Sequence, residues 1–204
     1  PIYLGFFLYT FYFHYFYLMV QYSKGFDIML TALYIHVPFC NSICTYCDFH
    51  KEVATLAKKK RYIMALKKEL QSHRGEYDYI ESIYIGGGTP SSLPNDLLIE
   101  LLSEIKTLIN LEHVIEYTIE TNPNDITKDL TVLLKEYGIN RISMGVQSFN
   151  EAHLSFMKRS HRNHHVYQAI KNIRAAGIDN VSVDMMFSLI NQTSCISTSL
   201  PNFC

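Results

Sequence analysis

The chain has 204 residues, of which 48% are hydrophobic, and a formal net charge of −1. This length accommodates one sizeable domain with its own core, and the balanced charge excludes the basic excess typical of nucleic-acid-binding proteins. The densest positive run, residues 58–61, is expected on a solvated helix face, and His161, His164 and His165 are also expected to be solvated. Five cysteines are too few and too clustered for a secreted disulfide framework, so the sequence favours a reducing cytoplasm.

Residues 1–28 differ in composition from the rest of the chain. They hold 12 of the 27 Phe and Tyr residues, and their first charged side chain is Lys24. Three interpretations compete: a membrane anchor, a signal peptide, and translation from upstream of a start at Met29. Spanning helices are usually rich in Leu, Ile and Val with Tyr at the interfaces, and no basic region or small-residue cleavage site is present. We therefore favour a non-native segment and expect membrane association only if it is native.

From residue 32 onward, strand and helix patterns alternate. Apolar runs predict strands at 32–37, 81–88, 114–121, 141–146 and 180–187. Apolar residues spaced by three and four predict helices at 58–72, 97–109, 127–137 and 165–177. This alternation predicts an α/β fold with a parallel sheet. We expect a partial (βα) barrel within residues 29–193, truncated after about five strands, and an irregular tail at 194–204 that results from truncation or a frameshift.

Residues suited to chemistry stand at the ends of the predicted strands. Gly86–Thr89 end the second strand, Glu120 ends the third, Gln147 follows the fourth, and Asp184 lies in the last half of the fifth. In parallel α/β folds, ligands gather at the carboxyl ends of the strands. The sequence therefore predicts one ligand site at this edge of the sheet.

Three cysteines follow the first predicted strand in the spacing C-x3-C-x2-C: Cys40, Cys44 and Cys47. Thiolates bind zinc or iron–sulfur clusters. A structural zinc site needs four ligands, and no second CxxC pair follows, although His36 and His50 flank the loop. Three thiolates also suit a four-iron cluster whose open iron binds a substrate or cofactor. This interpretation is favoured, with zinc and unligated thiols as the alternatives.

This cysteine spacing, with Tyr46 before the last cysteine, resembles the signature of the radical S-adenosylmethionine (SAM) proteins. The stretches LYIHVPFC, IGGGTPSSL, IETNPND, RISMGVQSF and VSVDMMFSL resemble, in order and spacing, the oxygen-independent coproporphyrinogen III oxidase family. The resemblance covers roughly residues 30–193. It implies a partial barrel of the radical SAM type, a [4Fe–4S] cluster on Cys40, Cys44 and Cys47, and SAM on the open iron.

The same resemblance implies a set of SAM-binding residues: Tyr34, Tyr46, Gly87, Gly88, Thr89, Glu120, Gln147, Arg159 and Asp184. Glycines let the backbone approach a ligand closely, Glu120 is expected to bind ribose hydroxyls, and Arg159 is suited to hold a carboxylate. Ordinary alternatives stay open. The glycines suit a βα turn, Tyr34 suits the core, Arg159 suits the surface, and Asp184 suits a capped strand end.

Phe49 separates two branches of the family. The oxidase branch has a further cysteine at this position, whereas the CDF ending resembles the branch of HemW-like heme chaperones. This branch implies heme or porphyrin as a ligand, a heme-recipient protein as partner and a cytoplasmic location, and leaves the electron donor unknown. The alternatives are the coproporphyrinogen oxidase itself, a zinc-stabilised binding module and an inactive fragment. Ile190, where the family usually has proline, favours a truncated chain.

Overall fold

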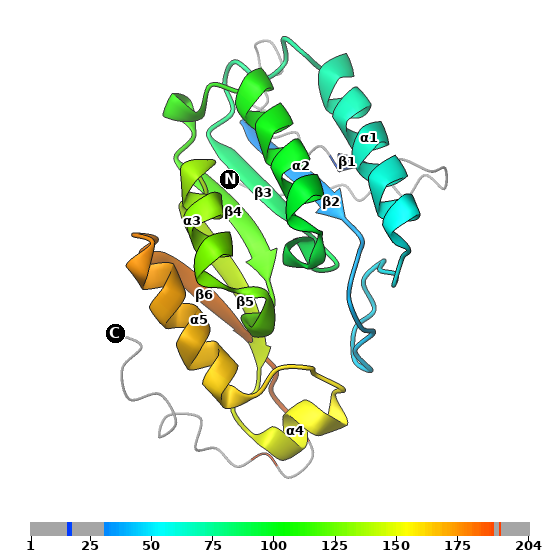
Figure 1. Cartoon of the computed structure of the whole chain (residues 1–204), viewed down its shortest axis with the longest axis vertical. Coiled ribbons are helices and arrows are strands. Elements are labelled where there is room, and N and C mark those ends of the chain that lie inside the picture. Colours follow the sequence, from blue (N-terminus) through cyan, green and yellow to red (C-terminus); the bar gives the residue numbers. More distant parts are fainter. Residues whose placement is uncertain (1–15, 18–30, 190–191, 193–204) are drawn as a thin grey trace, which may run out of the picture.

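The computed structural model describes residues 16–17, 31–189 and 192 (Figure 1). Its sheet has six strands in sequential order. Five of them run parallel: β2 (Ala32–Val37), β3 (Ser82–Gly87), β4 (Glu116–Thr121), β5 (Arg141–Gln147) and β6 (Asn180–Met185). The short strand β1 (Phe16–Tyr17) pairs antiparallel with β2. The fold is therefore the open, mainly parallel α/β sheet that the alternating pattern predicts.

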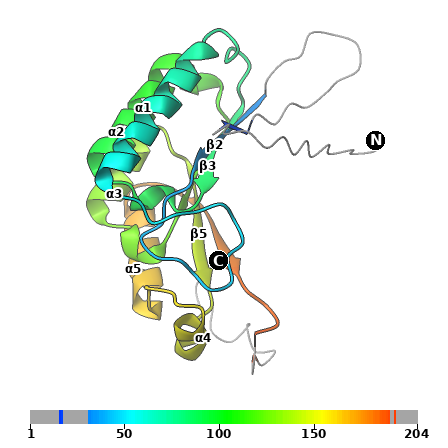
Figure 2. The same ribbon diagram turned by 90° about the vertical axis from the view of Figure 1, so that its right-hand side faces the viewer.

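The helices cover one face of this sheet, as Figure 2 shows from the side. They are α1 (Leu56–Ser72), α2 (Asn95–Leu108), α3 (Lys128–Glu136), α4 (Glu151–Phe156) and α5 (Asn163–Ala175). Three short 3-10 turns connect elements at η1 (Pro90–Ser92), η2 (Leu111–His113) and η3 (Pro123–Asp125). The four predicted helices are confirmed with small changes at their ends. The sequence did not indicate α4, because six residues are too short to show a helical period.

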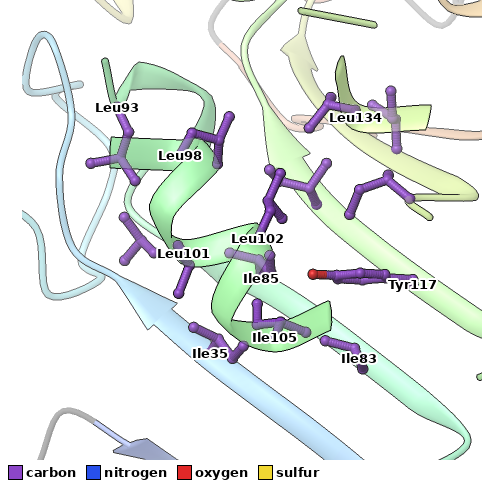
Figure 3. Packing of buried hydrophobic residues seen from close by; sticks show 14 of the residues in the cluster. Ile35, Ile83, Ile85, Leu93, Leu98, Leu101, Leu102, Ile105, Tyr117 and Leu134 are labelled. Carbon is purple, nitrogen blue, oxygen red and sulfur yellow. The ribbon is translucent and has the colours of Figure 1, made fainter. Parts of the chain in front are cut away.

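The core lies between the sheet and the covering helices (Figure 3). Along β3, Ile83 and Ile85 are fully buried and pack beneath Leu98 and Leu102 of α2. Side chains alternate between the two faces of a strand. Tyr84, between the two isoleucines, therefore points to the face that the helices leave open. That open face carries the polar side chains described below.

Two predictions about the surface are wrong for one residue each, whereas Lys58, Lys60, Arg61 and His164 are exposed as expected. Lys59, in the basic run, is only 8% exposed, because its ammonium group reaches inward and donates to the Ser92 carbonyl at 3.2 Å. His161 is fully buried, because the loop between α4 and α5 folds its side chain into the protein. Spacing along the chain does not reveal burial of this kind, since it depends on which distant segments cover the residue.

Several expectations lie outside the described residues. They concern residues 1–15 and 18–28, the position of Ile190 and the irregular tail at 194–204. Phe16 and Tyr17 form backbone pairs with Ile35 and Tyr34. In the part of the chain that the structure describes, no helix is both long and apolar enough to cross a membrane.

Candidate functional site

A cavity of about 730 Å³ opens at the carboxyl ends of the parallel strands. Polar groups from β3, β4, β5 and β6 line it, together with the loop that follows β2. It collects all of the predicted ligand residues, which are Tyr34, Cys40, Cys44, Tyr46, Cys47, Gly87, Gly88, Thr89, Glu120, Gln147, Arg159 and Asp184. The prediction that strand-end residues meet at one site is therefore confirmed as a matter of position. Their roles stay predictions.

The cysteine loop is held in place by the backbone on both sides. The Cys40 amide donates to the Glu52 carbonyl at 3.0 Å, and the Glu52 amide donates back to Pro38 at 2.8 Å. The Lys51 ammonium group donates to the Cys47 carbonyl. The three thiols are free, and within the described ranges no three His, Cys, Asp or Glu side chains form a ready metal site.

Two of the three sulfur atoms have polar partners in the cavity. The Thr89 hydroxyl lies 3.6 Å from the sulfur of Cys40, and the Arg159 Nη1 donates to the sulfur of Cys44 at 3.5 Å. Burial raises the pKa of the Cys40 thiol, and the neighbouring sulfurs of Cys47 and Cys44 act in the same direction against the Thr89 hydrogen bond. Metal binding would deprotonate these thiols. Three thiolates that share one cavity with such donors fit a site-differentiated iron–sulfur cluster.

The glycine turn after β3 is required by packing inside the protein. A Cβ on Gly88 would lie 2.8 Å from the backbone of Pro38 and Phe39, and one on Gly87 would lie 2.5 Å from the His36 ring. Gly87 also has a φ of 118°, which side-chain-bearing residues rarely adopt. The turn therefore needs glycine to reach the base of the cysteine loop. Close approach of a ligand to its backbone stays a prediction.

Glu120 extends from β4 into the cavity and is held by two donors. Its Oε1 accepts from the Tyr84 hydroxyl at 2.8 Å, and its Oε2 accepts from the Gly87 amide at 3.0 Å. Burial raises the pKa of the carboxyl, the two hydrogen bonds oppose that effect, and the nearby charge of Asp184 adds to it. Each oxygen keeps a second lone pair. Glu120 is thus a fixed acceptor for hydroxyl groups of a ligand.

Gln147 and Arg159 also line the cavity. Gln147 follows an irregularity in the pairing of β5 with β6 and has a φ of 68°, an uncommon conformation for a residue with a side chain. Arg159 donates to the Gly145 carbonyl and, at 2.5 Å, to the Asn122 side-chain oxygen. A Cβ at Gly145 would lie 3.3 Å from the Gln147 side-chain amide nitrogen and in ordinary contact with the Arg159 guanidinium at 3.4 Å.

Aromatic and acidic side chains complete the rim. Tyr34 stacks against Tyr84 with ring centroids 5.8 Å apart, which places it on the cavity face rather than in the core. Burial raises the pKa of Asp184, while the positive charges of Arg141 and Arg159 act in the opposite direction. Burial also raises the pKa of Tyr46, so its phenol stays neutral beside the cysteines.

The sequence did not single out every residue that lines the cavity. The main additions are Tyr84, which holds Glu120, Lys51, which holds the cysteine loop, and Asn122, which contacts both Thr89 and Arg159. Alternation along β3 placed Tyr84 on the open face, and Asn122 directly follows a predicted strand. Both signals were available, but neither residue carries a motif of its own.

The family model described as the radical SAM superfamily matches residues 34–195. The chain belongs to this superfamily. Membership implies a [4Fe–4S] cluster and SAM as cofactors, which agrees with the prediction from the cysteine spacing. The predicted fold, a partial barrel of the radical SAM type, is confirmed as well.

Curated relatives include proteins named heme chaperone HemW. The chain is 41% identical over 162 residues to the one from Lactococcus lactis subsp. lactis (strain IL1403), covering 79% of this chain and 42% of the relative. It is 33% identical over 165 residues to the one from Escherichia coli (strain K12), covering 79% of this chain and 44% of the relative. The chain therefore spans only about two fifths of the length of these relatives.

Solved structures agree with the fold. The coproporphyrinogen III oxidase HemN from Escherichia coli superimposes with a TM-score of 0.69 at 27% identity, covering 76% of this chain and 36% of that one. The protein anSMEcpe with bound AdoMet superimposes with a TM-score of 0.51 at 17% identity, covering 76% of this chain and 43% of that one. The second likeness concerns the fold alone.

Proposed function

We propose that this chain carries the cluster-binding and SAM-binding part of a heme chaperone of the HemW type. The observation that carries the proposal is Phe49, which stands where the oxidase branch has a further cysteine, within a stretch 41% identical to a protein named HemW. Phe49 lines the cavity and is 75% exposed. Because residue 49 is Phe, this position offers no fourth cysteine thiol beside Cys40, Cys44 and Cys47.

The residues that would hold the cofactors follow from their positions. Cys40, Cys44 and Cys47 would ligate a [4Fe–4S] cluster, which supplies one electron for cleavage of SAM when it is bound. Thr89 and Arg159 would donate to the sulfurs that they already contact. Soft thiolate ligands select such a cluster over hard cations.

The remaining polar groups would orient SAM. Glu120, fixed by Tyr84 and Gly87, presents acceptors to the ribose hydroxyls. Gln147 and Asp184 line the same cavity and offer further polar contacts.

Heme is proposed as the cargo, and a heme-accepting protein as the partner, by analogy with the name of the relatives. No residue of this chain is assigned as the heme ligand. The electron donor is not assigned either. The cytoplasmic location stays a prediction.

Anaerobic reconstitution of the chain with iron and sulfide tests the proposal. We expect about four irons per chain, loss of the cluster in Cys40→Ser, Cys44→Ser and Cys47→Ser, and retention in the control Cys195→Ser. Titration with SAM and with hemin then tests both ligands, and release of 5′-deoxyadenosine after reduction tests cleavage.

Three results would redirect the assignment. Bound zinc without iron or sulfide would contradict the radical SAM part and favour a zinc-stabilised module. A cluster without heme binding would contradict only the chaperone part. Vinyl-group formation from coproporphyrinogen III would favour the oxidase, the activity named for the structural relative HemN.

A further inference from the structure

Asn122 follows directly after β4 and lies between the two residues that contact the sulfurs of Cys40 and Cys44. Its Nδ2 donates to the Thr89 hydroxyl oxygen at 3.2 Å, and its Oδ1 accepts from the Arg159 Nη2 at 2.5 Å. Thr89 lies against the sulfur of Cys40, and Arg159 donates to the sulfur of Cys44. One amide side chain thus connects the hydrogen-bond partners of two sulfur atoms that are four residues apart in the loop.

The backbone of Asn122 is fixed on both sides. Its amide donates to the Ser91 hydroxyl at 3.3 Å, and its carbonyl accepts from the Asp125 amide at 3.0 Å. The Ser91 hydroxyl in turn donates to the Asp125 carboxylate at 2.8 Å. The side chain of Asn122 is therefore presented from a rigid frame that joins η1 to η3.

The chemistry of the amide decides which way the Thr89 hydroxyl points. A hydroxyl has one hydrogen and two lone pairs. Because Asn122 donates to the Thr89 oxygen, the hydrogen of that hydroxyl is left for the sulfur of Cys40. A cluster-bound thiolate has no hydrogen to give, so Thr89 must be the donor in that contact. On the other side, the Asn122 Oδ1 accepts from the Arg159 Nη2, while the Arg159 Nη1 donates to the sulfur of Cys44.

We propose that Asn122 is a positioning residue that aims the hydrogen-bond donors of Thr89 and Arg159 at two cluster sulfurs and so raises the reduction potential of the cluster. The proposal rests on the iron–sulfur part of the proposed function. Hydrogen bonds to cluster sulfurs are one of the terms that set such potentials. They stabilise the reduced cluster, whose sulfurs carry more negative charge.

The variants are chosen to separate the two sides of the amide. Asn122→Ala removes both contacts. Asn122→Asp keeps an acceptor for Arg159 but cannot donate, so the Thr89 hydrogen turns from the Cys40 sulfur to the new carboxylate. Thr89→Val removes the hydroxyl alone. Asn140→Ala is the matched control, because the Asn140 side chain also bridges two partners, the Tyr117 amide and the Ile115 carbonyl, and it does not line the cavity.

The readout is the midpoint potential of the reconstituted cluster, titrated with dithionite and followed by electron paramagnetic resonance without added SAM. We expect Asn122→Ala to lower the equilibrium constant for reduction about tenfold, which is about 59 mV more negative for a one-electron couple. Asn140→Ala should leave the potential at that of the parent chain. The iron and sulfide contents of each sample are measured as well, so that only proteins carrying the cluster are compared.

A double-variant cycle separates positioning from a general loss of structure. If Asn122 acts through Thr89, the double variant Thr89→Val with Asn122→Ala should lower the midpoint potential by less than the sum of the decreases in the two single variants. Additive decreases, or an unchanged potential in Asn122→Ala and Asn122→Asp, would overturn the inference and leave the proposed function standing. Failure of the parent chain to assemble a cluster would overturn both. If Asn122→Ala does not load, an unchanged potential in Asn122→Asp overturns the inference on its own, because that variant removes the donor to Thr89 and adds a negative charge.

Discussion

The buried histidine His161 allows a quantitative prediction about stability at acidic pH. Its side chain is fully buried, and neither ring nitrogen has a hydrogen-bond partner among the described residues. Burial lowers the pKa of His161 to about 4, and the positive charge of Arg159 acts in the same direction. The Val146 backbone carbonyl opposes this, but without good hydrogen-bond geometry.

The sign and size follow from linkage. The ordinary pKa of 6.5 applies to the unfolded chain, whereas the folded chain keeps the ring neutral until about pH 4. The stability contribution is therefore fully present above pH 6.5 and is lost as the pH falls toward 4. Each pH unit between the two values is worth about 1.4 kcal/mol. The loss reaches about 2 kcal/mol at pH 5 and about 3 kcal/mol at pH 4.

The perturbation is His161→Leu, which replaces the ring by an apolar side chain that does not titrate. Urea unfolding of the parent and the variant between pH 7.5 and 5 gives the difference in free energy of unfolding at each pH. Other groups titrate in both chains and cancel in this difference. We expect the variant to gain about 2 kcal/mol relative to the parent over this range. A difference that does not change with pH would refute the reasoning, and His113→Leu, at an exposed position, is the control.

Three further predictions concern packing and charge. Gly88→Ala should cost about 3 kcal/mol, because its Cβ would meet the backbone of Phe39, while Gly177→Ala, with open space and a φ of 76°, should cost about 1 kcal/mol in the same thermal melts. Leu98→Ala should lower the free energy of unfolding by about 3 kcal/mol in urea, and a loss below about 1 kcal/mol would contradict its place in the core. Burial raises the pKa of Asp125, so its contribution to the free energy of unfolding is lost as the pH rises above 3.8. The free energy of unfolding of Asp125→Asn should therefore rise relative to that of the parent chain toward neutral pH. A difference between variant and parent that falls over this range would contradict the prediction.

The order of strands and helices could be predicted because its causes are local. Buried positions repeat every two residues in a strand and every three or four in a helix, and these repeats depend on neighbours in the chain. Gly138 and Gly177, just beyond α3 and α5, adopt φ values of 90° and 76°, as a glycine at a helix end allows. The cysteine spacing is equally local. It indicates the radical SAM superfamily without any knowledge of contacts between distant residues.

The sequence also predicted that the ligand residues lie close together, because this follows from the predicted parallel sheet. Strands in a parallel sheet end at the same edge, so Glu120, Gln147 and Asp184 had to approach one another once the sheet was predicted. The pattern does not reveal which atoms touch. Arg159 contacts the sulfur of Cys44 across 115 residues of chain, and no periodicity encodes that pairing.

Burial and packing were decided by the tertiary structure. The basic run contains one lysine, Lys59, that turns inward, and the histidine-rich loop contains one ring, His161, that is covered from all sides. Gly88, directly after β3, is required because the backbone of Pro38 and Phe39 lies against it. Asn122 matters because its amide lies between Thr89 and Arg159. Each of these depends on segments far apart in the chain, so the sequence alone determined the elements, the cysteine loop and the edge of the site, while the fold decided which side chains act together.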